Sequence, residues 1–470
     1  MEIFGQDDEI ESGELPQKAR GPLVEVRRSL KGVGGGRGVF AVDAIEVGTL
    51  VLAEVPVEVW ADAASLDDPD LLLQVIESIL GHEEALAACK TLHPTSFAAA
   101  DEGDRQRIAS VWSDDDIEGL CRRALSRPTR EEVLCIALAL QHNGFASGLY
   151  SKLTLVNHSC RPNCIKFSPS SSTGWASEIW TTRPVQKGEE LTICYSEPLE
   201  MTSAAMRAAL LTHHRFECCC TKCLATADTR NAAPTAAAVE AAGLLSRLQD
   251  EAAMMEKELR YQKADGAVDI LKTTRSMLTA AEGMIAAIVS TPEADPADRT
   301  GLLVRLHKLS ANAAAALLEA FEEINRSGGT GEHKRVKSSI ARDAASNFLL
   351  HSLALRDAQT ALLGDCHPDL AGTLLDVDQG FALLLEGDLF AQPAARQAVL
   401  AELAARSYAW ASGRALIKAE WARCKREGQR IKRLYARHPR FSSTVANLTF
   451  PGSFYLPAAA STESTGPLLL

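Results

Sequence analysis

The segment LVNHSCRPNC, from Leu155 to Cys164, concentrates side chains that can bind metals or form several hydrogen bonds. It places one histidine, two asparagines and two cysteines around a proline, directly after an apolar run. Three interpretations fit these residue types: a cysteine nucleophile with a histidine base, a metal site, or a polar loop in the core. His158 and Cys160 are two positions apart and would share one face of a strand. The residue types alone leave all three interpretations open.

A second concentration of cysteines, FECCCTKC, lies further along the chain. It contains the spacing C-x-C-x-x-C in three residues: Cys218, Cys220 and Cys223. Thiolates at this spacing can bind one tetrahedral Zn²⁺, but a structural zinc site normally has four protein ligands. We expect Cys160 to supply the fourth ligand, with Cys164 and His158 as weaker options. The alternative is a surface loop that is prone to oxidation and binds no metal.

The segment KGVGGGRGVF is rich in glycine and lies between two stretches with strand character. A dinucleotide-binding loop requires G-x-G-x-x-G between a strand and a helix. Counted from Gly32, the sixth position is Arg37, and counted from Gly34 it is Val39, so the segment lacks the pattern. It is therefore either a hairpin turn, in which glycine relieves steric strain, or a loop that brings backbone amides close to a ligand.

The composition bounds the class of protein. The chain has 470 residues, of which 46% are hydrophobic and 23% charged, as in a soluble globular protein of two or three domains. Its net charge of -12 disfavours binding to nucleic-acid phosphates. We expect no membrane span, because no apolar run reaches about 18 residues. The acidic start of the chain does not resemble an import leader, so we expect a cytoplasmic or nuclear protein without a disulfide framework.

The hydrophobic pattern divides the chain into regions. Strand-like segments before residue 60 are followed by a helical insertion at about 61–133, and strands then return around SKLTLVNHSC, CIKFSP, ASEIWTTRPV and EELTICYSEPL. Residues 235–440 are predicted to form six or seven helices in antiparallel, tetratricopeptide-like hairpins. The basic run RCKREGQRIKRLYARHPR near their end is interpreted as a solvated helix face. Residues 1–21 and 441–470 are expected to be disordered tails.

Four motifs together resemble one known family. GRGVFA, NHSCRPNC, RPVQKGEELTICY and RFECCCTKC occur in the order found in SET-domain protein-lysine methyltransferases, and most resemble the SMYD subfamily. The resemblance covers residues 22–60 and 134–224, and beyond about 235 it rests on helical character and position. It implies an α+β fold. Residues 22–198 would form a β-rich SET domain that contains a pseudoknot, and residues 199–224 a zinc-binding post-SET segment. Residues 235–440 would form an all-α helical-hairpin domain.

One feature of the SMYD subfamily is missing from the sequence. SMYD proteins carry a MYND zinc finger after the first strands, whereas this region has only Cys89 and Cys121 before Cys135. These cysteines are too few for the two zinc sites of a MYND finger. We therefore expect a SMYD-like chain that lacks this finger.

The resemblance assigns roles to individual residues. It implies S-adenosylmethionine as the methyl donor, bound by Gly36, Arg37, Gly38, Asn143, Asn157, His158, Tyr195 and Phe216. The implied ligands of a structural Zn²⁺ are Cys160, Cys218, Cys220 and Cys223. Tyr195 is also the implied catalytic tyrosine, on a segment that passes beside NHSC. His214 stands where many SMYD proteins have a tyrosine in the wall of the lysine channel.

The implied reaction is in-line attack by a lysine Nε on the sulfonium methyl group. Because the reference pKa of lysine is about 10.4, forming the neutral amine costs about 4 kcal/mol at pH 7.5. A narrow apolar channel beside a cation would lower that pKa. The partner is then a protein with a target lysine, either a histone tail or another protein, and the helical domain could bind further proteins. A non-catalytic scaffold and a peptide-binding module are the alternative functions.

Overall fold

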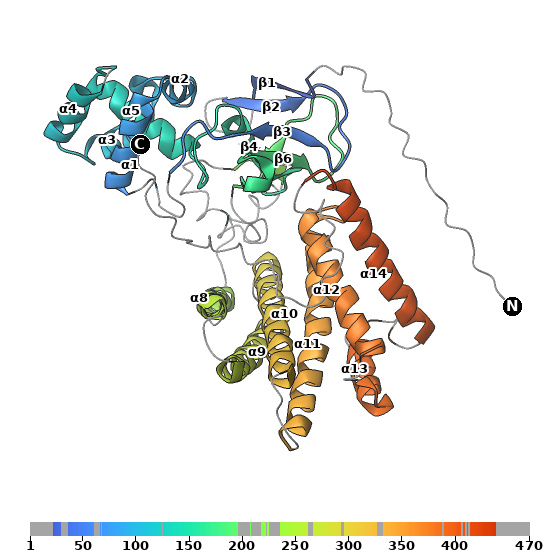
Figure 1. The fold of residues 1–470 in the computed structure, drawn as a ribbon. Coiled ribbons are helices and arrows are strands. Elements are labelled where there is room, and N and C mark those ends of the chain that lie inside the picture. Colours follow the sequence, from blue (N-terminus) through green and yellow to red (C-terminus); the bar gives the residue numbers. More distant parts are fainter. Residues whose placement is uncertain are drawn as a thin grey trace.

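The structure is a computed structural model of the chain. It describes residues 22–29, 36–60, 66, 68–124, 126–195, 207, 218–221, 223–224, 236–261, 267–292, 296–326, 332–387, 390–405, 408, 411 and 414–438. The molecule has two regions: a β-rich region with a cluster of short helices beside it, and a bundle of long helices (Figure 1).

Short strands form the β-rich region. β1 (Val24–Arg28) and β2 (Arg37–Ala41) pair antiparallel, and residues 30–35 between them, which include the start of the glycine-rich segment, lie outside the described residues. β3 (Leu50–Glu54), β6 (Ser177–Thr181) and β5 (Cys164–Phe167) form a second antiparallel sheet in that order. The pairing of β5 with β6 joins the two predicted strand segments CIKFSP and ASEIWTTRPV in a hairpin.

A third pair of strands joins segments that are distant in sequence. β4 (Asn157–His158) and β7 (Thr192–Ile193) pair in parallel, with Asn157 opposite Thr192 and His158 opposite Ile193. Parallel strands cannot be linked by a tight turn, so the intervening chain, including β5 and β6, makes the crossover.

One predicted strand is wrong. The segment SKLTLV forms a 3₁₀ turn at Leu153–Leu155 rather than a strand. The Glu54 carboxylate on β3 accepts hydrogen bonds from the backbone N–H groups of Ser151 and Leu153, at 2.8 and 2.7 Å, and from that of Lys152. A side-chain carboxylate thus satisfies donors that a strand would give to a neighbouring strand.

Among the described residues between β3 and β4, five α-helices form the insertion: α1 (Pro69–Gly81), α2 (Glu83–Thr91), α3 (Glu102–Ala109), α4 (Asp114–Arg123) and α5 (Arg130–Asn143). Their apolar faces meet in a core of their own, centred on α5. A capping box between Thr129 and Glu132 begins α5, and an apolar run continues it to Asn143, beyond the end expected at residue 133.

Seven further helices occupy the described residues after 235, in agreement with the six or seven predicted. They are α8 (Ala236–Tyr261), α9 (Ala267–Val289), α10 (Pro296–Arg326), α11 (Glu332–Leu363), α12 (Pro368–Leu385), α13 (Pro393–Ala405) and α14 (Arg414–Leu434). Consecutive helices pack side by side from α8 to α12, and α14 packs on α12 (Figure 1). No described helix has both the length and the apolar character that crossing a bilayer requires.

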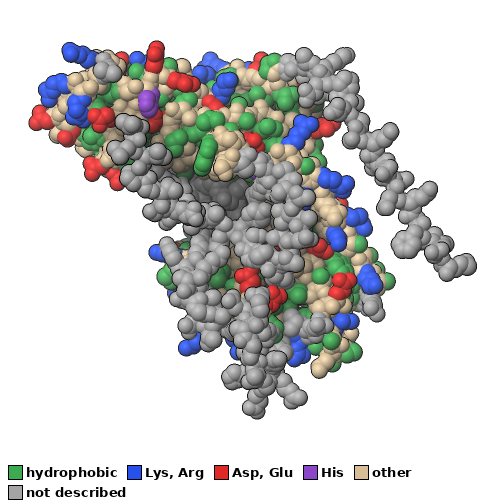
Figure 2. All heavy atoms as spheres, in the orientation of Figure 1, with side chains coloured by type: hydrophobic (Ala, Val, Ile, Leu, Met, Phe, Trp, Pro, Cys, Tyr) green, Lys and Arg blue, Asp and Glu red, His purple; other side chains and the backbone are tan. Residues whose placement is uncertain are grey.

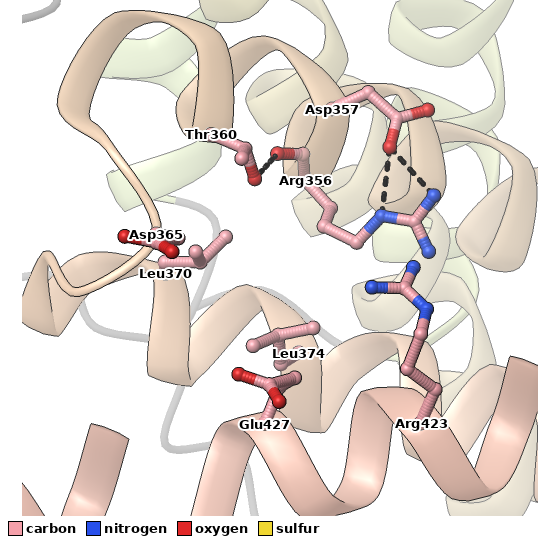
Figure 3. A pocket seen from close by; sticks show the side chains of 8 residues that line it. All are labelled: Arg356, Asp357, Thr360, Asp365, Leu370, Leu374, Arg423 and Glu427. Carbon is pink, nitrogen blue, oxygen red and sulfur yellow. Dashed lines mark hydrogen bonds and ion pairs between the residues drawn. The ribbon is translucent and has the colours of Figure 1, made fainter. Parts of the chain in front are cut away.

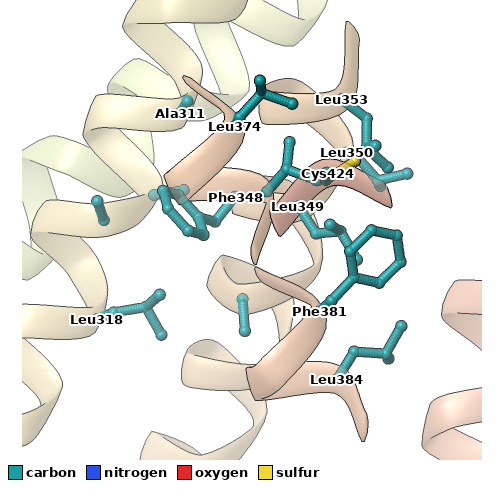
Figure 4. Packing of buried hydrophobic residues seen from close by; sticks show 14 of the residues in the cluster. Ala311, Leu318, Phe348, Leu349, Leu350, Leu353, Leu374, Phe381, Leu384 and Cys424 are labelled. Atoms are coloured by element: carbon teal, nitrogen blue, oxygen red, sulfur yellow. The ribbon is translucent and has the colours of Figure 1, made fainter. Parts of the chain in front are cut away.

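Small side chains let these helices approach closely. In α10, Ala311, Ala314 and Ala315 are buried against leucines of the neighbouring helices, and Figure 4 shows Phe348 and Phe381 in the same cluster. A Cβ on Gly380 of α12 would lie 2.9 Å from a methyl carbon of Leu349 on α11, a distance that packed atoms do not reach. Apolar packing therefore sets the spacing of the bundle.

The bundle and the β-rich region share part of their core. Trp180 of β6 and Phe167 of β5 belong to the same buried cluster as the long helices. Beyond the end of α14, the buried hydroxyl of Tyr435 contacts the backbone oxygens of Thr181 and Cys366, at 3.1 and 3.0 Å. His438 stacks on Phe167 with ring centroids 4.0 Å apart. The end of the chain's helical region is therefore fixed against the β5–β6 hairpin.

The basic run on α14 faces solvent. Arg423, Lys425, Arg426 and Arg433 are exposed, and Figure 2 shows Lys and Arg side chains along the edge of the molecule that α14 forms. This exposure agrees with the interpretation of the run as a solvated helix face.

Candidate active site

Polar side chains fasten the NHSC turn to the strand that leads to Tyr195. The β4–β7 ladder continues where the Ser159 N–H donates to the Ile193 carbonyl, at 2.9 Å. The fully buried amide of Asn163 accepts from the Thr192 N–H at 2.8 Å and donates to the Glu190 carbonyl at 2.9 Å. The two segments therefore lie side by side, as expected from the sequence.

His158 links this strand to the cysteines. The backbone N–H of Tyr195 donates to His158 Nδ1 at 3.1 Å, so Nδ1 is the unprotonated nitrogen of the ring. In the neutral ring Nε2 then carries the proton, and it lies 3.2 Å from Cys160 Sγ. The imidazole thus donates to the sulfur and cannot act as the base that activates it. This geometry disfavours the cysteine–histidine nucleophile.

The Tyr195 hydroxyl points back toward the turn. It donates to the carbonyl of Val156 at 3.1 Å, and the Tyr195 ring lies 5.3 Å from the His158 ring. Burial, and to a smaller degree the Glu190 carboxylate, raise the pKa of the Tyr195 hydroxyl above its ordinary value. The hydroxyl therefore stays protonated at neutral pH and provides a fixed dipole rather than a base.

The four cysteines predicted as metal ligands come together. The sulfur atoms of Cys160, Cys218, Cys220 and Cys223 all lie within 4.8 Å of one another. Cys160 Sγ is 3.8 Å from Cys218 Sγ and 3.6 Å from Cys223 Sγ. With Zn–S bonds of about 2.3 Å, the sulfurs of a regular tetrahedral site lie about 3.8 Å apart, so this cluster could hold zinc.

The local chemistry of the sulfurs agrees with a metal site. Cys160, Cys220 and Cys223 are buried, and the backbone N–H of Cys220 donates to Cys218 Sγ at 3.5 Å. Contacts with the Cys218 and Cys220 sulfurs, followed by burial, raise the pKa of Cys160. Hydrogen bonds from Cys160 and Cys218 lower the pKa of Cys220. A zinc ion would be bound by thiolates, and its charge would offset their mutual repulsion at these distances.

The predicted cofactor loop lies on the other side of the turn. Gly38 leaves no room for a side chain, because a Cβ there would collide with Glu190 Oε1 and lie 2.9 Å from Asn157 Nδ2. A Cβ on Gly36 would meet open space. The Arg37 side chain points away, to the carbonyl of Thr91 at the end of α2. From Arg37 only the backbone is directed at the turn.

Asn157 bridges this loop and the NHSC turn. Its Nδ2 donates to the Arg37 carbonyl at 3.0 Å and to Glu190 Oε1 at 2.7 Å. Its Oδ1 accepts no hydrogen bond from the described residues and remains available to an ammonium donor. The half-buried amide thus holds the loop and retains one acceptor for a ligand.

The remaining predicted cofactor residues are less informative. The Asn143 side chain, at the end of α5, donates to the carbonyls of His93 and Ala139, at 2.6 and 2.7 Å. Phe216 and His214 lie outside the described residues. Contacts of these three residues with a cofactor or substrate remain predictions.

Three residues of the site were not among those predicted to act. The buried Glu190 accepts from Asn157 and also from Ser29 Oγ at 2.8 Å, so it joins β1 to the turn. Phe145 packs edge-on against Tyr195, with ring centroids 6.5 Å apart, and Lys166 lies over Phe145. The motif KGEELTICY contains Glu190, but its role depends on contacts that span more than 30 residues.

A cavity of about 460 Å³ lies apart from these residues, among α11, α12 and α14. It is lined by Arg356, Asp357, Thr360, Asp365, Leu370, Leu374, Arg423 and Glu427 (Figure 3). Glu420 Oε1 accepts from both Arg356 and Arg423, each at 2.7 Å, and Asp357 also binds Arg356. The cavity therefore contains a compensated charge network and none of the residues predicted for the chemistry.

Comparison with known proteins agrees with the geometry. Residues 36–196 match the family model of the SET domain. Over 77 residues, 16% of this chain and 17% of each relative, the chain is 44% identical to histone-lysine N-methyltransferase SMYD3 of Mus musculus and of Homo sapiens. It is 32% identical over 90 residues to protein-lysine N-methyltransferase SMYD4 of Mus musculus, 19% of this chain and 11% of the relative. The chain thus matches only a small part of the length of these relatives.

Proposed function

We propose that this chain, which carries a SET domain with SMYD-family methyltransferase homologues, is an S-adenosylmethionine-dependent protein-lysine N-methyltransferase. The observation that supports this most strongly is a convergence in space. The NHSC turn, the strand to Tyr195 and the cysteine cluster meet at His158, which contacts the Tyr195 backbone and the Cys160 sulfur.

The cofactor would bind along β2 and the NHSC turn. S-adenosylmethionine supplies an electrophilic methyl group on a positively charged sulfur. Gly36 leaves open space beside the start of β2, and Asn157 Oδ1 offers an acceptor for the amino group of the methionine moiety. Glu190 would hold the Asn157 amide in this orientation through its 2.7 Å hydrogen bond.

The acceptor lysine would enter along aromatic rings. Phe145 packs edge-on against Tyr195 and also against Tyr150, with ring centroids 6.5 and 5.7 Å apart. These rings exclude water, and this desolvation together with the nearby sulfonium charge of the donor would lower the pKa of an entering amine. The Tyr195 hydroxyl, held by Val156 O, would orient the amine.

The cysteine cluster would bind a structural zinc ion. Four sulfur ligands close the coordination sphere, so this metal would stabilise the fold rather than take part in the reaction. The His158 Nε2–H would donate to the Cys160 thiolate, which orients both the ligand and the strand that carries Tyr195.

The substrates would be protein lysines. SMYD3 is named for histone lysines and SMYD4 for protein lysines, and we propose lysines of histones, of other proteins, or of both. The long helices α8–α14 would supply further protein contacts, and the protein would act in the cytoplasm, the nucleus or both.

A methyl-transfer assay tests this function. Purified protein is incubated with methyl-labelled S-adenosylmethionine and either peptide arrays or whole-cell extract, and mass spectrometry then locates the label. We expect label on lysine side chains, which identifies the substrate and the methylation number together. Absence of label from all proteins would favour the non-catalytic scaffold.

A further inference from the structure

A lysine of the chain itself lies against the aromatic rings beside Tyr195. Lys166 is on β5, and its Nζ is 5.0 Å from the centroid of the Phe145 ring and 5.9 Å from that of Tyr150. Nζ also contacts Ser147 Oγ at 3.3 Å. The amine is thus held between a short loop and two aromatic faces.

One of the two rings that hold Lys166, that of Phe145, also contacts the proposed catalytic tyrosine. One edge-on contact joins Phe145 to Tyr150, and another joins Phe145 to Tyr195. One aromatic side chain, Phe145, therefore contacts both the Lys166 amine and the Tyr195 ring. An acceptor lysine from another protein would need the same surroundings, namely aromatic walls and a nearby tyrosine hydroxyl.

A methyl acceptor must be a neutral amine, and Lys166 loses its proton more readily than an ordinary lysine. Burial lowers the pKa of Lys166 from 10.5 to about 8. Within the described residues, Lys166 forms no ion pair that would restore the charge. At pH 8 about half of such amines are neutral, against less than 1% for an ordinary lysine, a difference of about 10²-fold.

We propose that Lys166 is an internal methyl acceptor, modified by its own chain. This inference rests on the proposed function, since the methyl donor is S-adenosylmethionine. The lone pair of the neutral Nζ forms a bond to the methyl carbon as the sulfur–methyl bond breaks, and the electron pair of that bond stays on sulfur. The donor becomes the neutral thioether S-adenosylhomocysteine, and its positive charge passes to the methylated Nζ, which is now an ammonium group.

The product would stay where it forms. Aromatic faces attract methylated ammonium groups, so a methylated Lys166 remains favourable against Phe145 and Tyr150. Lys152 and Lys187 are exposed, and neither lies over an aromatic ring among the described residues. They belong to the same domain and serve as internal controls.

Peptide mass spectrometry tests the proposal. The full chain is incubated at pH 8 with S-adenosylmethionine that carries a deuterated methyl group, alone and with the extract used above. We expect label on Lys166, about 10²-fold more than on Lys152 or Lys187. The rate per chain should not change on dilution, because the reaction is intramolecular. The variant Lys166→Arg should lose this label.

A second readout needs no methyl donor. In NMR spectra of protein with isotope-labelled lysine side chains, the signal that Lys166→Arg removes should titrate near pH 8. A midpoint near the ordinary 10.5 would overturn the proposal. If proteins of the extract carry the label and Lys166 does not, self-methylation is overturned and the proposed function stands. No label on any protein would overturn both.

Discussion

In the SET domain, strands of two to five residues bring together side chains that are far apart in sequence, whereas in α8–α14 helices of 13 to 32 residues pack mainly on their neighbours along the chain. Long helices satisfy their own backbone, so their contacts can be almost entirely apolar. Short strands cannot, and the side chains of Glu54, Asn163 and Glu190 complete the hydrogen bonding. Polar substitutions should therefore matter most in the SET domain and apolar ones in the bundle.

The two regions also differ in where reactive groups lie. The SET domain contains buried thiols, a buried tyrosine hydroxyl and a lysine with a lowered pKa. The bundle also contains a buried thiol, Cys424, and a carboxyl, Asp376, whose pKa burial raises to about 7. At its cavity Arg356 is paired with Glu420 of another helix. The proposed chemistry lies in the region with the least regular secondary structure.

The largest effect is expected for Tyr195→Phe. The change removes the hydroxyl that donates to Val156 O and leaves the ring in contact with Phe145. Misplacement of the acceptor amine should lower kcat by about 10²-fold. Steady-state kinetics with the labelled donor measures this loss, and metal content and the melting curve should not change. Wild-type turnover would remove Tyr195 from the catalytic residues.

The next effect concerns the cysteine cluster. Cys220→Ser removes one of four sulfur ligands, so metal analysis should fall from about one zinc per chain to well below one. The melting temperature should fall by roughly 2–4 °C for each kcal/mol lost. Cys219→Ser is the matched control, because Cys219 is exposed and lies outside the cluster. Equal melting curves for the two variants would contradict a structural metal.

A smaller effect is expected at the loop beside the turn. In Gly38→Ala the new methyl group collides with Glu190 Oε1, which disturbs the Asn157 amide at a cost of about 1–3 kcal/mol. The Kd for S-adenosylmethionine should rise by about tenfold. Gly81→Ala, on α1, where the added Cβ also meets open space, should bind the donor like the wild type. Equal weakening by both variants would mean that this contact has no part in binding.

The smallest effect is expected where the two regions meet. Tyr435→Phe removes the one hydroxyl proton that the carbonyls of Thr181 and Cys366 share, and Thr181 O still accepts from the Gly48 N–H, so the cost is about 1 kcal/mol. Thermal unfolding should show lower stability, with kcat nearly unchanged. Tyr408→Phe, which removes a more exposed hydrogen bond to Asp357, should have a smaller effect. A large loss of kcat in Tyr435→Phe would show that the bundle controls the chemistry.

The sequence predicts the helices of the bundle because helical periodicity is local. It also indicates that Cys160 joins the cysteine cluster. The three cysteines at 218, 220 and 223 supply only three of the four ligands of a tetrahedral zinc site, so a fourth must come from elsewhere in the chain. It fails at Leu153–Leu155, where β-branched and apolar residues suggest a strand but the Glu54 carboxylate binds the backbone instead. The roles of Glu190 and Lys166 were not predicted, because burial and ring contacts arise only in the folded chain.

The proposed function requires that β2, the NHSC turn and the strand to Tyr195 together form one binding site for S-adenosylmethionine. Calorimetric titration of the purified chain with S-adenosylmethionine is the direct test of this site. The proposed site predicts saturable heat with one donor molecule per chain, reduced about tenfold in affinity by Gly38→Ala. An absence of both binding heat and thermal stabilisation in well-folded, zinc-loaded protein would contradict it.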